Sequence, residues 1–170
     1  MKNEKCFVQN ACFEEVIASI QYDDETKIAC INSSLVDGKN MLRSDEKNSS
    51  ATDKNETSSY GIGQLIGFAV DLGARIVNVE LSQGISTDEG IGIFASLGAS
   101  FDDVKGCGFV PTKSTFNKID GIDFSLMFPR LQGAQINFFD KESSLPVEML
   151  NDVFRSKLGA KDVLEFVKGK

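Results

Sequence analysis

One uninterrupted stretch, Ser58 to Ser100, most constrains the fold of this chain of 170 residues. Apolar residues over Ile62–Leu72 recur at helical spacing, and Gly73 offers the left-handed residue on which helices commonly end. The β-branched run Ala74–Leu81 then predicts a buried strand. A polar loop, residues 82–90, separates this strand from a second helix. This order predicts an α/β domain, in which ligands bind at the carboxyl ends of strands.

Weaker patterns extend the domain on both sides of this stretch. Two strand-like runs, Glu14–Gln21 and Thr26–Ile31, flank a polar turn and predict a hairpin near the start of the chain. Ala134–Phe139 predicts a further strand. Two amphipathic helices are predicted, one starting at Pro146 and one over Ala160–Val167. The expected fold class is α/β, with a mixed sheet and flanking helices.

Residues 43–59 form the most polar part of the chain, and Ala51 is their only apolar residue. Because so little apolar surface can be buried there, burial would not offset the conformational entropy lost on ordering the segment. We therefore expect a mobile surface loop over 43–59, within a single domain that spans residues 1–170.

Composition argues against several classes of function. The net charge is −7 and no run of Lys or Arg occurs, which makes nucleic-acid binding improbable. No apolar run approaches the ~18 residues of a membrane span. The start of the chain also lacks the apolar core of a signal peptide, so a cytoplasmic protein is expected. With no His and no C-x-x-C pair, neither a metal site nor His-based catalysis is expected.

Four segments resemble, in the same order and at matching spacing, motifs of the bacterial glycerate kinase family. They are SSYGIGQLI, LGARIVNV, STDEGIGIFASLGASF and IDGIDFSLMFPRL. That family transfers a phosphoryl group from ATP to glycerate, so the resemblance implies Mg-ATP and glycerate as ligands. It also implies that most of this chain is equivalent to the inserted central domain of a two-lobed enzyme, whose active site lies between the lobes.

The family loop G-G-S-A-T-N-D-G-G-A-G supplies most of the candidate site residues. Aligned on its last glycine, it corresponds here to residues 82–92. The resemblance implies Asp88, and Asp140 at the end of a later strand, as catalytic carboxylates. It implies Ser86, Thr87, Gly90 and Gly92 as contacts to substrate or phosphate. From the residues alone, Asp88 has an alternative role as the cap of the helix that begins near Gly90.

The departures from the family pattern concern the same loop. Glycines of the family motif are replaced by Gln83 and Glu89. If these positions have positive φ, both side chains are strained, and Glu89 adds a negative charge where an anionic ligand would have to lie. The family motifs P-D-S-F-K-G-S and A-D-G-G-E-G-T have no counterpart in the sequence.

Together these features predict a truncated, diverged glycerate kinase homologue. If active, it would transfer a phosphoryl group from ATP to glycerate, with little turnover as a lone chain. One alternative is a non-catalytic binding module, which would dock on a second kinase lobe, on a full-length paralogue or on another copy of itself. The other alternative is a decayed remnant, a pseudoenzyme without a selected role.

Overall fold

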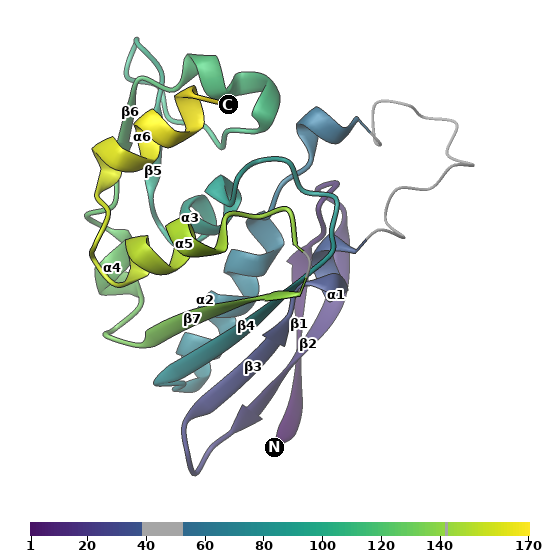
Figure 1. The fold of residues 1–170 in the computed structure, drawn as a ribbon. Coiled ribbons are helices and arrows are strands. Elements are labelled where there is room, and N and C mark those ends of the chain that lie inside the picture. Colours follow the sequence, from purple (N-terminus) through teal and green to yellow (C-terminus); the bar gives the residue numbers. More distant parts are fainter. Residues whose placement is uncertain (39–52, 142) are drawn as a thin grey trace.

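The computed structural model describes residues 1–38, 53–141 and 143–170 and contains a five-stranded mixed sheet (Figure 1). The strands lie in the order β1 (Lys2–Gln9), β2 (Glu15–Asp23), β3 (Ile28–Asn32), β4 (Ile76–Ser82) and β7 (Gln135–Lys141). β1, β2 and β3 pair antiparallel, whereas β3, β4 and β7 run parallel. The α/β class and the mixed sheet predicted from the sequence are confirmed.

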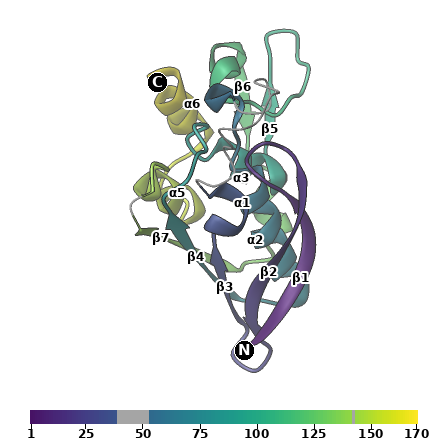
Figure 2. The ribbon, with the colours of Figure 1, turned by 90° about the vertical axis from the view of Figure 1, so that its right-hand side faces the viewer.

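The helices and a second, two-stranded sheet complete the fold. The helices are α1 (Ser34–Asp37), α2 (Tyr60–Leu72), α3 (Ile91–Ser96), α4 (Met127–Arg130), α5 (Val147–Phe154) and α6 (Ala160–Lys168), with two 3-10 helices, η3 (Lys54–Glu56) and η4 (Lys113–Lys118). The small sheet pairs β5 (Ser100–Asp102) with β6 (Gly121–Asp123). Figures 1 and 2 both place α6 and this small sheet at the end of the molecule opposite the N-terminus. None of the helices within the described ranges is long and apolar enough to cross a membrane.

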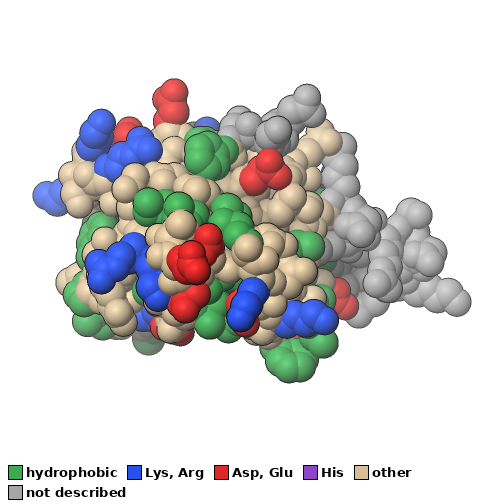
Figure 3. Space-filling view, turned by 90° about the horizontal axis from the view of Figure 1, so that it is seen from below, with side chains coloured by type: hydrophobic (Ala, Val, Ile, Leu, Met, Phe, Trp, Pro, Cys, Tyr) green, Lys and Arg blue, Asp and Glu red, His purple; other side chains and the backbone are tan. Residues whose placement is uncertain are grey.

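Side chains alternate between a buried and an open face of the large sheet. In β4, Val77, Val79 and Leu81 are fully buried, whereas Asn78 and Glu80 between them are only half-buried. Parallel strands are usually covered on both faces and apolar throughout. The polar alternation here reflects a sheet that carries its core on one face only. Viewed from below, the molecule presents acidic, basic and hydrophobic side chains interspersed, with no large patch of one charge (Figure 3).

Local differences from the predicted elements have physical reasons. The predicted hairpin is confirmed as β2 and β3, but β1 was missed because half of it is the polar run Lys2–Lys5, which carries no strand pattern. β1 pairs along its whole length with β2 and forms an edge of the sheet.

Of the expected surface loop over 43–59, residues 43–52 lie outside the described residues. Residues 53–59 contain η3 and the approach to α2. Residues 53–56 are exposed, as a surface loop requires. For Thr57, Ser58 and Ser59 the expectation is wrong, because they are at most 1% exposed and their hydroxyl groups find hydrogen-bond partners in the interior.

A side chain closes the outer edge of β7. Asn151, in α5, accepts a hydrogen bond at Oδ1 from the backbone N–H of Phe138 (2.9 Å). Its Nδ2 donates to the carbonyl oxygen of Phe138 (3.1 Å). The amide of Asn151 therefore makes the two hydrogen bonds that a residue of a neighbouring antiparallel strand would make.

Candidate functional site

Three parallel strands end side by side at one edge of the sheet, and the predicted loop lies there. Residues 82–90 leave β4 at Ser82, whose N–H donates to the hydroxyl oxygen of Ser33, just after β3 (2.8 Å). On the other side of β4, Asp140 of β7 pairs in register with Leu81. The candidate residues of the loop and Asp140 therefore belong to the same edge, at the carboxyl ends of β3, β4 and β7. Open α/β sheets bind ligands at such an edge.

Asp88 is fully buried where helices α2 and α3 begin. Its Oδ2 accepts hydrogen bonds from Ser59 N (2.9 Å), Ser59 Oγ (3.0 Å), Ser58 Oγ (3.3 Å) and Gly92 N (2.9 Å), and its Oδ1 accepts one from Gly90 N (3.1 Å). Burial raises the pKa of Asp88, whereas the hydrogen bonds from Ser59 and Gly92 oppose this rise. The carboxylate thus joins the amino ends of two helices, where negative charge is favoured.

This arrangement gives Asp88 a positioning role in the folded chain. Both of its oxygens are occupied and the side chain is 0% exposed, so it does not reach a substrate unless α2 and α3 move. The backbone N–H groups of Gly90 and Gly92 donate to the same carboxylate and are not available to a phosphate. In this structure the three residues hold the loop in place.

Thr57 fixes the middle of the loop to the segment before α2. Its hydroxyl lies 3.0 Å from the carbonyl oxygen of Ile85 and accepts a hydrogen bond from Thr87 N (3.1 Å). The hydroxyl of Thr87 donates in turn to the carbonyl oxygen of Lys54. Among loop residues 86–88, only Thr87 keeps solvent exposure. Thr87 is therefore the candidate best placed to meet a ligand.

A second buried carboxylate, Asp37 at the end of α1, was not predicted. Its Oδ1 accepts hydrogen bonds from Ile85 N (3.0 Å) and Ser86 N (2.9 Å). Burial raises the pKa of Asp37 to about 6, opposed by hydrogen bonds from Ser86 and Ile85. The hydroxyl of Ser86 is also buried, and it has no partner of normal geometry among the described residues. Asp37 and Asp88 thus lie on either side of Ser86, close enough that the charge of Asp88 also raises the pKa of Asp37.

The backbone conformation of Glu89 matches that of a glycine. Its φ is +55°, in the left-handed region. The positive φ on which the predicted strain depends is therefore present at Glu89 and absent at Gln83. The loop keeps a glycine-type conformation at residue 89 even though a glutamate occupies it.

Glu89→Gly is expected to raise the free energy of unfolding by up to about 1 kcal/mol. A left-handed non-glycine residue costs about 1–2 kcal/mol, and the larger entropy of glycine in the unfolded chain offsets about half of this. Urea unfolding at neutral pH measures the change. Gln83→Gly is the matched control, and it should lower stability by about 0.5–1 kcal/mol. Equal effects at the two positions would contradict the argument.

The two buried carboxylates at this edge, Asp37 and Asp88, are not placed to hold Mg²⁺. The ion is held by accessible carboxylate oxygens and waters. Asp37 and Asp88 are instead buried, and their oxygens accept backbone N–H groups. No group of three or more His, Cys, Asp or Glu that could hold a metal ion occurs within residues 1–38, 53–141 and 143–170.

Comparison with known proteins identifies the family. A sequence model of the glycerate kinase family matches residues 1–143. The chain belongs to the glycerate kinase family. A glycerate kinase from Bacillus cereus (strain ATCC 10987 / NRS 248) is 36% identical to it over 80 residues, which is 47% of this chain and 21% of the relative.

A solved structure agrees on the fold. The crystal structure of a protein provisionally named glycerate kinase 2, from Salmonella typhimurium LT2, matches with a TM-score of 0.71 at 22% identity. The match covers 81% of this chain and 35% of that protein. This chain therefore spans only a minor part of the length of both relatives.

Proposed function

We propose that this chain forms one side of a glycerate kinase active site, at which a phosphoryl group passes from ATP to glycerate. The observation that carries the proposal is the shape of loop 82–90. Asp88 fixes the loop between two helix amino ends, and residue 89, where the family motif has a glycine, has a left-handed backbone. The loop stands at the carboxyl ends of three parallel strands, where a ligand of an α/β sheet would lie.

The candidate residues have different roles in this proposal. Thr87, half-exposed on the loop, accepts a hydrogen bond from a hydroxyl group of the substrate, since its own hydroxyl hydrogen is donated to the carbonyl oxygen of Lys54. Asp140, in β7 at the same edge, is the catalytic carboxylate. Asp88 acts as a positioning residue, together with Ser86, Gly90 and Gly92, because these residues shape the loop from within.

Phosphoryl transfer also needs groups that cradle the ATP phosphates and neutralise developing charge. The relatives are several times longer than the matched region. We therefore place those of these groups that this chain lacks on a second lobe, provided by further sequence, by another protein or by a second copy. Mg-ATP binds between the two parts.

One observation favours a second candidate function, a non-catalytic binding module. Glu89 adds a carboxylate next to Asp88 in the loop, where the family motif has an uncharged glycine. A negative charge there weakens binding of an anionic substrate. The chain would then bind a kinase lobe without turning over glycerate.

Thr87→Val tests the proposal. In glycerate-dependent ADP release with Mg-ATP, we expect the variant to lose at least about tenfold in kcat/KM, because one substrate hydrogen bond is worth about 1.5 kcal/mol. Thr26→Val, in the exposed turn between β2 and β3, is the matched control and should leave the rate unchanged.

Asp88→Asn does not test a catalytic role by itself, because the substitution also disturbs the buried hydrogen bonds that join the amino ends of α2 and α3. If the wild-type chain shows no turnover but changes the activity of a full-length glycerate kinase mixed with it, the binding module is favoured over the enzyme. If the chain shows no turnover and has no effect on that kinase, both functions are refuted.

A further inference from the structure

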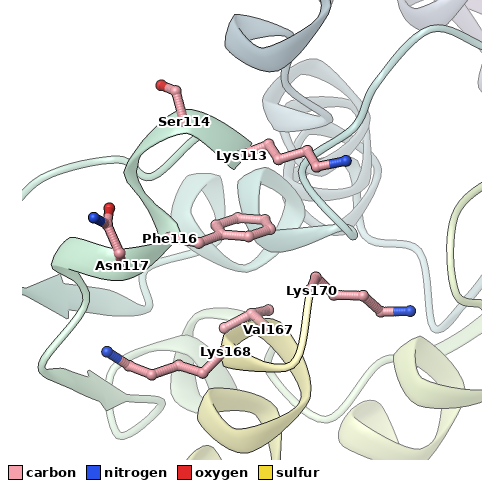
Figure 4. A pocket seen from close by; sticks show the side chains of 7 residues that line it. All are labelled: Lys113, Ser114, Phe116, Asn117, Val167, Lys168 and Lys170. Atoms are coloured by element: carbon pink, nitrogen blue, oxygen red, sulfur yellow. The ribbon is translucent and has the colours of Figure 1, made fainter.

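A cavity of about 400 Å³ lies between η4 and α6, outside the loop described above. It is lined by Lys113, Ser114, Phe116, Asn117, Val167, Lys168 and Lys170 (Figure 4). Neither the family motifs nor the sequence patterns pointed to these residues.

The cavity combines positive charge with an apolar floor. Phe116 and Val167 are 6% and 0% exposed and form its base. Three lysines line it, and no acidic residue of the described ranges does. In a chain with a net charge of −7, three lysines in one cavity would attract small anions, although Ser114 at its rim donates a hydrogen bond to the carboxylate of Glu56.

The lysines lie on two sides of the cavity. Figure 4 shows Lys113 and Lys170 extending to one side, and Lys168 and Asn117 extending to the other. Because the lysines extend to opposite sides, an extended anion with several charges suits this arrangement better than a compact anion with one charge.

The cavity also neighbours loop 82–90. The charges of Lys170 and Lys113 act on the carboxylate of Glu89, where they oppose the rise in its pKa that burial causes. An anion bound between η4 and α6 would thus lie beside the loop that carries Thr87. The 3-10 helix η3 connects the two features, because Ser114 of the cavity donates a hydrogen bond to Glu56 and the carbonyl oxygen of Lys54 accepts one from Thr87.

We propose that the cavity between η4 and α6 binds the phosphate chain of a nucleoside di- or triphosphate, with Lys113 and Lys170 on one side and Lys168 on the other. This inference rests on the proposed function in one respect, because it takes the bound nucleotide to be the ATP of the proposed kinase reaction. The phosphates would then compete with Glu89 for Lys113 and Lys170.

A purely structural role for the same lysines makes different predictions. Lys168 and Lys170 lie at the carboxyl end of α6, where positive charge stabilises a helix, and Lys170 Nζ lies 4.8 Å from the centre of the Phe166 ring. If they serve only the helix, their removal changes stability and leaves anion binding untouched.

Isothermal titration of the 170-residue chain with sodium tripolyphosphate and with ADP, without glycerate, tests the proposal. We expect Lys113→Met to weaken both ligands about tenfold, as loss of one phosphate contact does at low salt. Lys118→Met is the matched control, because Lys118 lies in the same 3-10 helix but does not line the cavity. Glu89→Gln should tighten binding about threefold.

Two further measurements complete the test. AMP should bind more weakly than ADP, because a single phosphate suits lysines on opposite sides of the cavity less well than two phosphates do. Three outcomes would each overturn the proposal. They are an equal loss of affinity in Lys113→Met and Lys118→Met, AMP binding as tight as that of ADP, and no binding of tripolyphosphate. The titration does not depend on turnover. If the chain binds ADP through Lys113 but produces no ADP from ATP and glycerate, the kinase reaction is refuted and the binding site is not.

Discussion

Gly92→Ala is expected to lower the free energy of unfolding by about 3–5 kcal/mol, a large share of the roughly 5–15 kcal/mol that is typical of folded domains. A Cβ at residue 92 would contact Ser58 Oγ and lie 2.5 Å from Tyr60 N and 2.8 Å from Asp88 Oδ2. These atoms form the brace between α2 and α3, so the added methyl group would both overpack it and break hydrogen bonds to Asp88.

Urea or thermal unfolding, followed by circular dichroism, measures this change. Gly121→Ala is the control, because a Cβ there meets no atom within 4 Å and the position does not have positive φ. It should change stability by no more than about 0.5 kcal/mol. A Gly92→Ala protein as stable as the control would mean that the close packing around Asp88 is not needed.

Asp37 is expected to make stability depend on pH in the opposite sense to a salt-bridged carboxylate. Its pKa is about 6 in the folded chain and 3.8 as the ordinary value. A raised pKa means that the folded state holds the proton more tightly than the unfolded state. The contribution of Asp37 is therefore complete below about pH 4 and is lost as the pH rises through about 6, with a total of about 3 kcal/mol.

Asp37→Asn isolates this contribution from that of the other carboxyl groups. The amide oxygen still accepts the N–H groups of Ile85 and Ser86, but the side chain no longer carries a charge at any pH. We expect the variant to match the wild type near pH 4 and to exceed its unfolding free energy by up to about 3 kcal/mol above pH 7. Urea unfolding from pH 4 to pH 8 measures the difference, and a constant difference across this range would refute the linkage.

The elements that the sequence predicts well have a strong local period. β4 and α2 were found close to their observed bounds because apolar residues repeat at strand and helix spacing and Gly73 ends the helix, with a φ of +111°. β1 could not be found in this way. It is half polar, and its place in the sheet depends on pairing with β2.

In the candidate site, too, the features set by nearby residues could be predicted, and those set by residues far apart in the sequence could not. The loop and the capping role of Asp88 follow from nearby residues, but the depth of its burial depends on Ser58 and Ser59, which lie some thirty positions earlier in the chain. Asp37 was missed because it meets the loop across 48 positions and has no local motif. The lysines of the cavity were missed for a similar reason, since η4 and α6 come together only in the folded chain.

The side chain of Asn151 has a consequence for how the molecule behaves in a crowded solution. Unpaired strand edges are the usual starting points of aggregation. At Phe138 the backbone of β7 is already paired with the amide of Asn151, so a strand from another molecule could add there only after displacing it. At this one position, Asn151 therefore opposes the addition of a further strand to the open edge of β7.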